Sequence, residues 1–158
     1  YTTATDDDTD TPLTIDVSDG DAVTTINRLI AVTPVNDAPV ANPTARLTGA
    51  SAGTAFDITY ESLRAAAGIS DVDSANPSIL VEAIIGGRLQ RWNGTTWQAL
   101  TITQSTPLAQ RRLSAGQRLR WLPPVGTTGA VRAFQIKASD GTRESAVTTQ
   151  VTIDVGAV

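Results

Sequence analysis

Short runs in which apolar and polar residues alternate dominate the chain, and they predict β-strands. Residues 13–17 place Leu13, Ile15 and Val17 on one face and polar side chains on the other, which is the pattern of a half-buried strand. Similar patterns predict further strands over residues 23–32, 54–58, 79–84, 88–92, 97–103, 118–122 and 134–138, and a last strand with Val147, Val151, Ile153 and Val155 on one face.

One segment has helical rather than strand character. Thr59 is a favoured N-cap residue, residues 60–67 follow as a short helix, and Gly68 provides a common helix end. Residues 40–47 are expected to be an extended entry, and residues 49–53 a glycine-bounded loop. Because about seven short strands joined by Gly, Asn and Pro turns are typical of the immunoglobulin fold, we expect an all-β Greek-key β-sandwich with one short helix.

The two ends of the chain carry similar sequences. The first match covers the alternating run and ends in Ser-Asp-Gly in both copies, and the offset between matching residues is 121 to 124 throughout. The matching pairs are residues 13–20 with 134–141, residues 22–25 with 146–149, and residues 30–35 with 153–158. Similarity at a nearly constant offset indicates an internal structural repeat.

The repeat predicts how the chain is divided. We expect residues 1–35 to be the C-terminal strands of a preceding repeat, residues 36–39 an inter-repeat linker, and residues 40–158 a complete repeat. A lone hairpin over residues 13–32 is at best marginally stable in water, so its apolar faces need partners. Since Val158 matches the last residue before the linker, we also expect the chain to be part of a longer protein.

The composition removes several kinds of chemistry. The 158 residues include no Cys and no His, which excludes disulfides, zinc sites with these ligands, haem ligation and catalysis by Cys or His. The Arg residues are spread singly apart from Arg111 and Arg112, so we expect no nucleic-acid partner. No apolar run has the length of a membrane span, so we expect no membrane insertion.

The acidic residues suggest a cation site. Of the 16 acidic residues, 13 are Asp, which favours turns and sites for hard cations. Asp71 and Asp73 form an Asp-x-Asp pair, but calcium needs six to eight oxygen ligands. Asp37 in the linker, Asp140 in the Ser-Asp-Gly turn and Asn76 are natural additions, because these segments can meet at one end of a sandwich. The alternative is that the Asp-x-Asp carboxylates are solvated turn residues.

The other charged residues do not indicate a catalytic site. The acidic run Asp6–Asp8 within residues 1–11 is typical of a solvated loop, with a cation-binding loop as the alternative. The three Glu are scattered, Lys137 is the only lysine, and no nucleophile–base pair stands out. A hydrolase with Asp71 and Asp73 as paired carboxylates has no further support, so we expect a protein that is not an enzyme.

Two tryptophans mark a candidate hairpin. Trp92 and Trp97 flank residues 93–96, and if those four residues form the loop the indoles face each other across two strands. Together with Arg91 they form a candidate site for a sugar or a peptide. The favoured alternative is a cross-strand pair that only stabilises the hairpin. Trp121 lies two residues after Leu119 and so shares its face of the expected strand, which places Trp121 in the core.

Five short motifs point to a known family. They are Val-Asn-Asp-Ala-Pro at 35–39, Ile-Thr-Tyr-Glu-Ser-Leu at 58–63, Ser-Asp-Val-Asp at 70–73, Leu-Arg-Trp-Leu-Pro at 119–123 and Ala-Ser-Asp-Gly at 138–141. This set resembles the cadherin-like and related immunoglobulin-like repeats of very large bacterial surface adhesins, a type often exported with RTX repeats. The resemblance implies that the expected sandwich is cadherin-like.

The resemblance also implies a set of calcium ligands. In cadherin-like repeats the linker Asp, an Asp-x-Asp pair and a late Asp bind Ca²⁺ at the junction, and these match Asp37, Asp71, Asp73 and Asp140. An early Glu ligates the opposite junction in that family, and Glu61 is its analogue, although it lies on a helix entry that cadherins lack.

The implied function is a calcium-rigidified structural extender repeat of a bacterial adhesin or filament that is secreted to the cell surface. Its expected partners are neighbouring repeats or subunits of the same protein, with host or matrix glycans or proteins as further candidates. Two other functions stay open. One is a carbohydrate- or peptide-binding module that uses the Trp92/Trp97 hairpin. The other is a filament subunit that assembles by strand complementation through residues 1–35.

Overall fold

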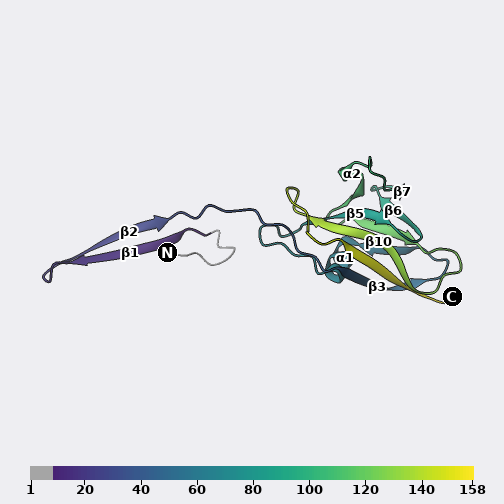
Figure 1. Cartoon of the computed structure of the whole chain (residues 1–158), viewed down its shortest axis with the longest axis horizontal. Coiled ribbons are helices and arrows are strands. Elements are labelled where there is room, and N and C mark those ends of the chain that lie inside the picture. The colour runs from purple at the N-terminus through teal and green to yellow at the C-terminus, as the bar shows by residue number, and fades with distance from the viewer. Residues whose placement is uncertain (1–8) are drawn as a thin grey trace. The chain divides into compact units, whose positions relative to one another are not determined.

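The computed structural model describes residues 9–158, and the acidic run Asp6–Asp8 lies outside the described residues. The chain divides into two compact units, residues 1–36 and residues 37–158 (Figure 1). Each unit is described by itself below.

The first unit is a two-stranded antiparallel hairpin. It pairs β1 (Thr11–Ser18) with β2 (Val23–Ile30), and Ile15 lies opposite Ile26. Both side chains remain exposed, at 43% and 37%, because within the described residues no further strand joins this sheet. The second strand ends two residues earlier than expected, where the Val32 amide donates to the Asp10 carboxylate at 3.0 Å.

The second unit is mostly β and contains two sheets, which confirms the expectation of an all-β chain in its coarse form. The five-stranded sheet has the order β3-β11-β10-β5-β8, and the four-stranded sheet has the order β4-β9-β6-β7. The elements are β3 (Thr44–Ser51), β4 (Phe56–Thr59), α1 (Tyr60–Ala67), β5 (Ser78–Ile84), β6 (Arg88–Trp92), β7 (Trp97–Leu100), α2 (Leu108–Arg111), β8 (Arg112–Leu113), β9 (Arg118–Leu122), β10 (Gly129–Ser139) and β11 (Thr149–Gly156).

Both sheets of the second unit contribute side chains to one hydrophobic cluster. Phe134 and Ile153 come from the five-stranded sheet, Leu89 and Trp121 from the four-stranded sheet, and Leu63 from α1. Trp121 is fully buried and its indole Nε1 donates to the Gly86 carbonyl at 2.8 Å, which removes the cost of burying that N–H. The expectation that Trp121 is a core residue is confirmed.

The first helix begins and ends where its sequence predicts. The Thr59 hydroxyl accepts a hydrogen bond from the Ser62 amide at 3.1 Å, which satisfies one of the free amides of the first turn. Gly68 ends the helix in the left-handed conformation, with a φ of 59°, and its amide bonds back to the last turn. Neither helix in the described residues is long and apolar enough to cross a membrane.

The prediction of a loop over residues 49–53 is wrong for its first three residues, because β3 continues to Ser51. Ala50 and Ser51 pair in parallel with Val155 and Gly156 of β11, after a shift in register. Gly49 lies at this irregularity with a φ of +99°, a conformation that glycine adopts without steric cost. The glycine therefore marks a bulge inside a strand, and the sequence pattern alone does not distinguish a bulge from a loop.

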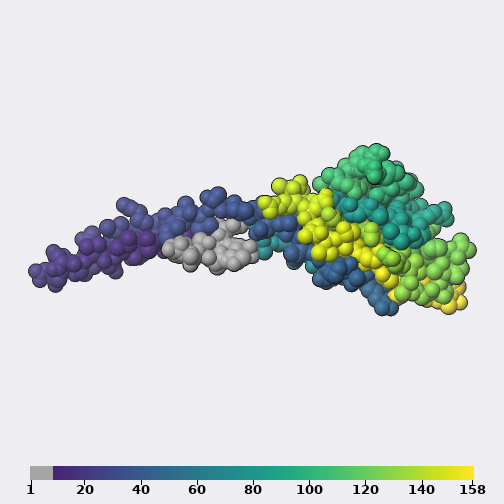
Figure 2. Space-filling view, in the orientation of Figure 1, coloured from purple at the N-terminus to yellow at the C-terminus, as the bar shows by residue number. Residues whose placement is uncertain are grey.

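The segment between β7 and β9 also departs from expectation. The strand expected over residues 97–103 ends at Leu100, and the Thr106 hydroxyl accepts from the Thr103 amide and donates to the Thr101 carbonyl in a tight turn. The short helix α2 follows, so the unit contains two helices rather than one. The residues around α2 protrude from the surface of the second unit (Figure 1 and Figure 2).

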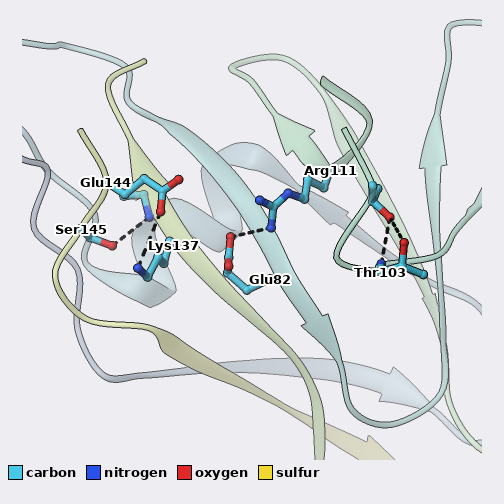
Figure 3. A network of polar contacts seen from close by, with 8 residues as sticks. Glu82, Thr103, Arg111, Lys137, Glu144 and Ser145 are labelled. Carbon is cyan, nitrogen blue, oxygen red and sulfur yellow. Dashed lines mark hydrogen bonds and ion pairs between the residues drawn. The ribbon is translucent and has the colours of Figure 1, made fainter. Parts of the chain in front are cut away.

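An ion pair fastens α2 to the five-stranded sheet. Arg111 Nη1 lies 3.0 Å from Glu82 Oε1 of β5 (Figure 3). Both side chains are about three-quarters buried, so this pair is less screened than one on the open surface.

Near the C-terminal end of the chain, Val147 lies outside β11 and is 40% exposed, so it does not share the buried face expected for it.

The buried hydroxyl of Tyr60 generates a prediction about stability. Its OH donates to the Pro77 carbonyl at 2.6 Å, and the side chain is almost fully buried. Replacing Tyr60 with Phe leaves that carbonyl without this donor and should lower the free energy of unfolding by about 1–2 kcal/mol. Urea denaturation at pH 7 measures the loss, and an unchanged stability would contradict the assigned hydrogen bond.

The same hydroxyl predicts a pH dependence. Burial raises the pKa of Tyr60, so its stabilising contribution is complete below the pKa of an unfolded tyrosine, about 10, and is lost as pH rises through the folded value. The stability of the unchanged protein should therefore fall more steeply above about pH 10 than that of Tyr60→Phe.

Candidate functional site

The linker, the acidic loop and the Ser-Asp-Gly turn lie at the same end of the second unit. Val40 and Ser70 exchange two backbone hydrogen bonds of 2.9 and 3.2 Å. The Asp37 amide donates to Asp73 Oδ2 at 2.6 Å. Beyond the acidic loop, the Ser78 hydroxyl donates to the Ser139 carbonyl at 2.9 Å, and Ser139 directly precedes the turn that carries Asp140.

Asp71 carries an unusual carboxylate. Its Oδ1 accepts from the amides of Asp73 and Ser74, at 2.8 and 3.1 Å, which closes the loop locally. Its Oδ2 is buried and has no hydrogen-bond partner, as is true of three other buried side-chain atoms in the described residues. A buried charged oxygen is costly without a partner. Such an oxygen fits a hard cation, which prefers carboxylate ligands.

The other predicted ligands have protein partners. Asp140 Oδ1 accepts from the amides of Thr142 and Arg143, both at 2.6 Å. Asn76 Oδ1 accepts from Arg64 Nη1 at 3.1 Å. Glu61 Oε1 accepts from the Gly116 amide at 3.2 Å, at the opposite end of α1 from the acidic loop.

The structure therefore brings together only part of the expected calcium constellation. Across residues 9–158, no group of three or more His, Cys, Asp or Glu side chains is close enough to hold a metal ion. Asp37 contacts Asp73 through its backbone amide, and the Asp140 carboxylate accepts hydrogen bonds from amides of its own turn. The remaining oxygen ligands of any bound calcium would have to come from backbone carbonyls, water or rearranged side chains.

The two Ser-Asp-Gly turns have the same hydrogen-bond pattern. Asp19 Oδ1 accepts from two following amides at 3.0 and 2.8 Å, as Asp140 Oδ1 does, and these amides lower the pKa of Asp19. The glycine amides bond back to Ser18 and Ser139 at 3.2 and 3.1 Å. A carboxylate that bonds to the amides two and three residues on is an Asx turn, which accounts for the shared Ser-Asp-Gly sequence.

The β6–β7 hairpin is formed as the sequence predicts. Trp92 pairs with Trp97 across the strands, and their ring centroids are 5.2 Å apart with an interplanar angle of 57°. Asn93 Oδ1 closes the four-residue loop by accepting from the amides of Thr95 and Thr96 at 2.9 and 2.8 Å. The tilted aromatic pair stabilises the hairpin beyond its buried area.

Two arginines of β9 complete the tryptophan pair. The Arg118 guanidinium lies 4.9 Å from the Trp92 centroid and 5.4 Å from that of Trp97, and the Arg120 guanidinium lies 4.2 Å from Trp97. Arg120 also forms a bidentate ion pair with Asp57, at 2.6 and 3.1 Å, and the hydrogen bond to Asp57 raises the pKa of Arg120. We refer to these five side chains as the tryptophan–arginine cluster, which consists of Asp57, Trp92, Trp97, Arg118 and Arg120.

The pairing of Arg118 and Arg120 with the indoles is missing from the sequence prediction. Both arginines alternate with buried Leu119 and Trp121, so they lie on the outer face of their strand. A second signal is the local charge, because residues 83–139 contain no Asp or Glu but eight Arg and Lys. Alternation and local charge together identify these arginines as a basic surface, but not which aromatic rings they contact.

Arg91 occupies a different position from the one expected. It alternates with Trp92 and so points to the other face of β6, opposite Gln98 of β7. Its guanidinium donates to the Ala109 carbonyl at 2.6 Å and to the Gln110 carbonyl and the Gln117 side chain, both at 3.4 Å. Arg91 and Trp92 still line the same pocket of about 450 Å³, at the end of the hairpin.

Comparison with known proteins gives little further information. No family model matches the chain, and no curated protein matches it. Among solved structures, the chain is similar to an endo-fucoidan hydrolase from glycoside hydrolase family 107, with 19% sequence identity and a TM-score of 0.44. The match covers 97% of this chain but only 19% of that enzyme.

This similarity contradicts the expectation that the chain is not an enzyme, because the matched structure is a hydrolase. We therefore withdraw that expectation. A TM-score of 0.44 at 19% identity also carries no argument for a hydrolase activity of this chain.

The tryptophan–arginine cluster generates a prediction about stability. Replacing Arg118 with Gln removes a cation that lies over both indoles and should lower the free energy of unfolding by about 0.5–1 kcal/mol. Arg88→Gln on β6 is the matched control, since Arg88 is exposed and contacts neither ring, and it should leave stability unchanged. Equal losses in the two variants, measured by urea denaturation, would show that Arg118 acts only through net charge.

Proposed function

We propose that residues 40–158 are a cadherin-like β-sandwich repeat with Greek-key connections, and that its acidic loop binds calcium beside the linker. The observation that carries the proposal is the 2.6 Å hydrogen bond from the Asp37 amide to Asp73 Oδ2. This contact links the linker directly to the Asp-x-Asp loop. An ion on the loop carboxylates would therefore act on the linker through one shared side chain.

The donors in this loop suit calcium. Asp71 supplies a buried carboxylate oxygen without a hydrogen-bond partner, and Asp73 supplies a second carboxylate two residues away. Calcium accepts carboxylate, carbonyl and water ligands in irregular geometry. Neutralising neighbouring carboxylates also favours the ordered loop over a more open one. Calcium binding would thus restrict the backbone at Asp37, and the repeat would act as a calcium-rigidified extender.

Similarity between the two hairpins supports a tandem arrangement. Leu13 lies opposite Arg28 in the first unit, and the matching residues Phe134 and Val151 lie opposite each other in the second. In the second unit, β5 and β3 flank this hairpin on its two edges. We propose that the first hairpin belongs to a preceding repeat, in which strands equivalent to β3 and β5 cover it.

The proposed setting is the surface of a bacterial cell, in a secreted adhesin or filament. Calcium sites of extracellular modules commonly have dissociation constants on the order of 0.1–1 mM, which suits the few protein ligands seen here. The partners in this proposal are neighbouring repeats of the same protein. A filament subunit is the second candidate, because the exposed Ile15 and Val17 side chains could be covered by another chain instead.

Calcium titration tests the proposed site. Calcium at about ten- to hundredfold over its dissociation constant should stabilise the protein by roughly 1.4–2.7 kcal/mol, measured as a higher melting temperature than in excess chelator. Asp71→Asn and Asp73→Asn should weaken binding, measured by calorimetry, by at least about tenfold. Asp57→Asn is the matched control, since both Asp57 carboxylate oxygens are engaged by Arg120 on the sheet. A melting temperature and a scattering profile that do not respond to calcium would refute the proposal.

Solution mass separates the tandem repeat from the filament subunit. A fragment of a tandem protein should remain a monomer over a wide concentration range, measured by analytical ultracentrifugation. Ordered multimers that dissociate after Ile15→Asp would favour assembly through the first hairpin, because the charge lies on its apolar face.

A further inference from the structure

A polar groove lies beside the β6–β7 hairpin of the second unit. It consists of two adjoining pockets of about 450 and 320 Å³ that share Arg91 and Gln98. These two residues lie opposite each other on neighbouring strands, so their side chains form a common floor. We call this feature the Arg91–Gln98 groove. Its position differs from that of the acidic loop, and nothing in the proposed calcium function uses it.

The groove offers the groups that hold a sugar ring. Gln98 and Gln110 contribute amide side chains that can both donate and accept a hydrogen bond. A sugar hydroxyl has the same dual character. Asn93 and Gln117 contribute amide N–H donors, because their oxygens already accept hydrogen bonds within the protein. Trp92 lines one end of the groove, but its indole lies on the opposite face of β6 from Arg91, so recognition depends on the amides and on Arg91.

The charge of the groove favours an anion. Arg91 bonds to two backbone carbonyls and a glutamine oxygen, and within residues 9–158 it takes part in no ion pair. No Asp or Glu is among the lining residues of either pocket. One acidic side chain lies at the rim, where Glu61 accepts from the Gly116 amide. The positive charge of Arg91 is therefore available to a ligand.

The arrangement is fixed before any ligand arrives. The carbonyls of Ala109 and Gln110 hold the Arg91 guanidinium, and the ion pair between Arg111 and Glu82 fastens α2, which carries those carbonyls, to β5 (Figure 3). The Gln117 oxygen also accepts from the Ser114 amide at 2.9 Å. Side chains that are already ordered lose little entropy on binding.

We propose that the Arg91–Gln98 groove binds an acidic oligosaccharide, with Arg91 facing a carboxylate or sulfate group and the amides facing neighbouring hydroxyls. A peptide would instead be expected to add to the free edge of β7, the outer strand of its sheet. That contact uses backbone groups rather than the floor of the groove, so substitutions at Arg91 and Gln98 distinguish the two ligands.

Calorimetric titration of the full chain with defined oligosaccharides tests the proposal. The probes are oligogalacturonate as a carboxylated ligand, dextran sulfate oligosaccharides as a sulfated ligand, and neutral dextran oligosaccharides of the same length. All titrations are done in excess chelator, so that calcium cannot bridge the ligand to the acidic loop. At least one acidic probe should bind at least about tenfold more tightly than the neutral one.

Two variants locate the site. Gln98→Glu places an acid in the groove and should weaken binding of the acidic probe by at least about tenfold, and Arg91→Gln should do the same. Gln104→Glu adds the same charge at an exposed turn outside both pockets and should leave binding unchanged. Because Arg91 also holds α2, urea denaturation checks that each variant is folded, and Gln98→Glu decides the test if Arg91→Gln is not.

Each result of these titrations either supports or overturns the proposed oligosaccharide site. Tighter binding of an acidic probe that is lost in Gln98→Glu but kept in Gln104→Glu supports the proposal. Equal binding of neutral and acidic probes, equal losses in both glutamate variants, or no binding of any oligosaccharide would overturn it. A failure here leaves the calcium response untouched, since that response depends on Asp71 and Asp73, and a failed calcium titration leaves the groove untouched.

Discussion

The second unit depends on the two hydrogen bonds that Val40 and Ser70 exchange. They fasten the chain just after the linker to the residues just after α1. A third bond, from the Asn42 amide to the Ala67 carbonyl at 2.8 Å, satisfies a carbonyl in the last turn of the helix. This short pairing holds together the start of β3, the end of α1 and the beginning of the acidic loop. The contact between Asp37 and Asp73 is possible only because these segments are already aligned.

Local signals accounted for the elements that the sequence predicted well. The cap of Thr59, the left-handed Gly68 and the Asn93 loop each depend on residues within a few positions of one another, so their sequence is sufficient to identify them. The bulge at Gly49 and the short strand β8 depend instead on partners more than thirty residues away. Those features could not be predicted, because local sequence patterns do not determine which distant strands pair with each other.

The candidate site was predictable to a similar extent. The sequence correctly indicated that the linker and the Asp-x-Asp loop are adjacent, and it correctly paired Trp92 with Trp97. It did not reveal that the Asp140 carboxylate is engaged by its own turn, although the same Asx chemistry explains that result. It also placed Arg91 with the indoles, whereas strict alternation along β6 sends it to the other face. The basic outer face of β9 is visible in the composition only when it is considered region by region, since residues 83–139 contain no Asp or Glu.

The parallel pairing of β3 with β11 has a consequence for folding during synthesis. Thr44 pairs with Gln150, so β3 leaves the ribosome about 100 residues before its partner, and contacts this distant form slowly. Until β11 arrives, the facing edges of β3 and β10 are both open, because β11 is inserted between them. In a tandem array the matching strand of an adjacent repeat could enter the same gap. The differences between the two hairpins, such as Arg28 where the later copy has Val151, would then help each repeat to select its own last strand.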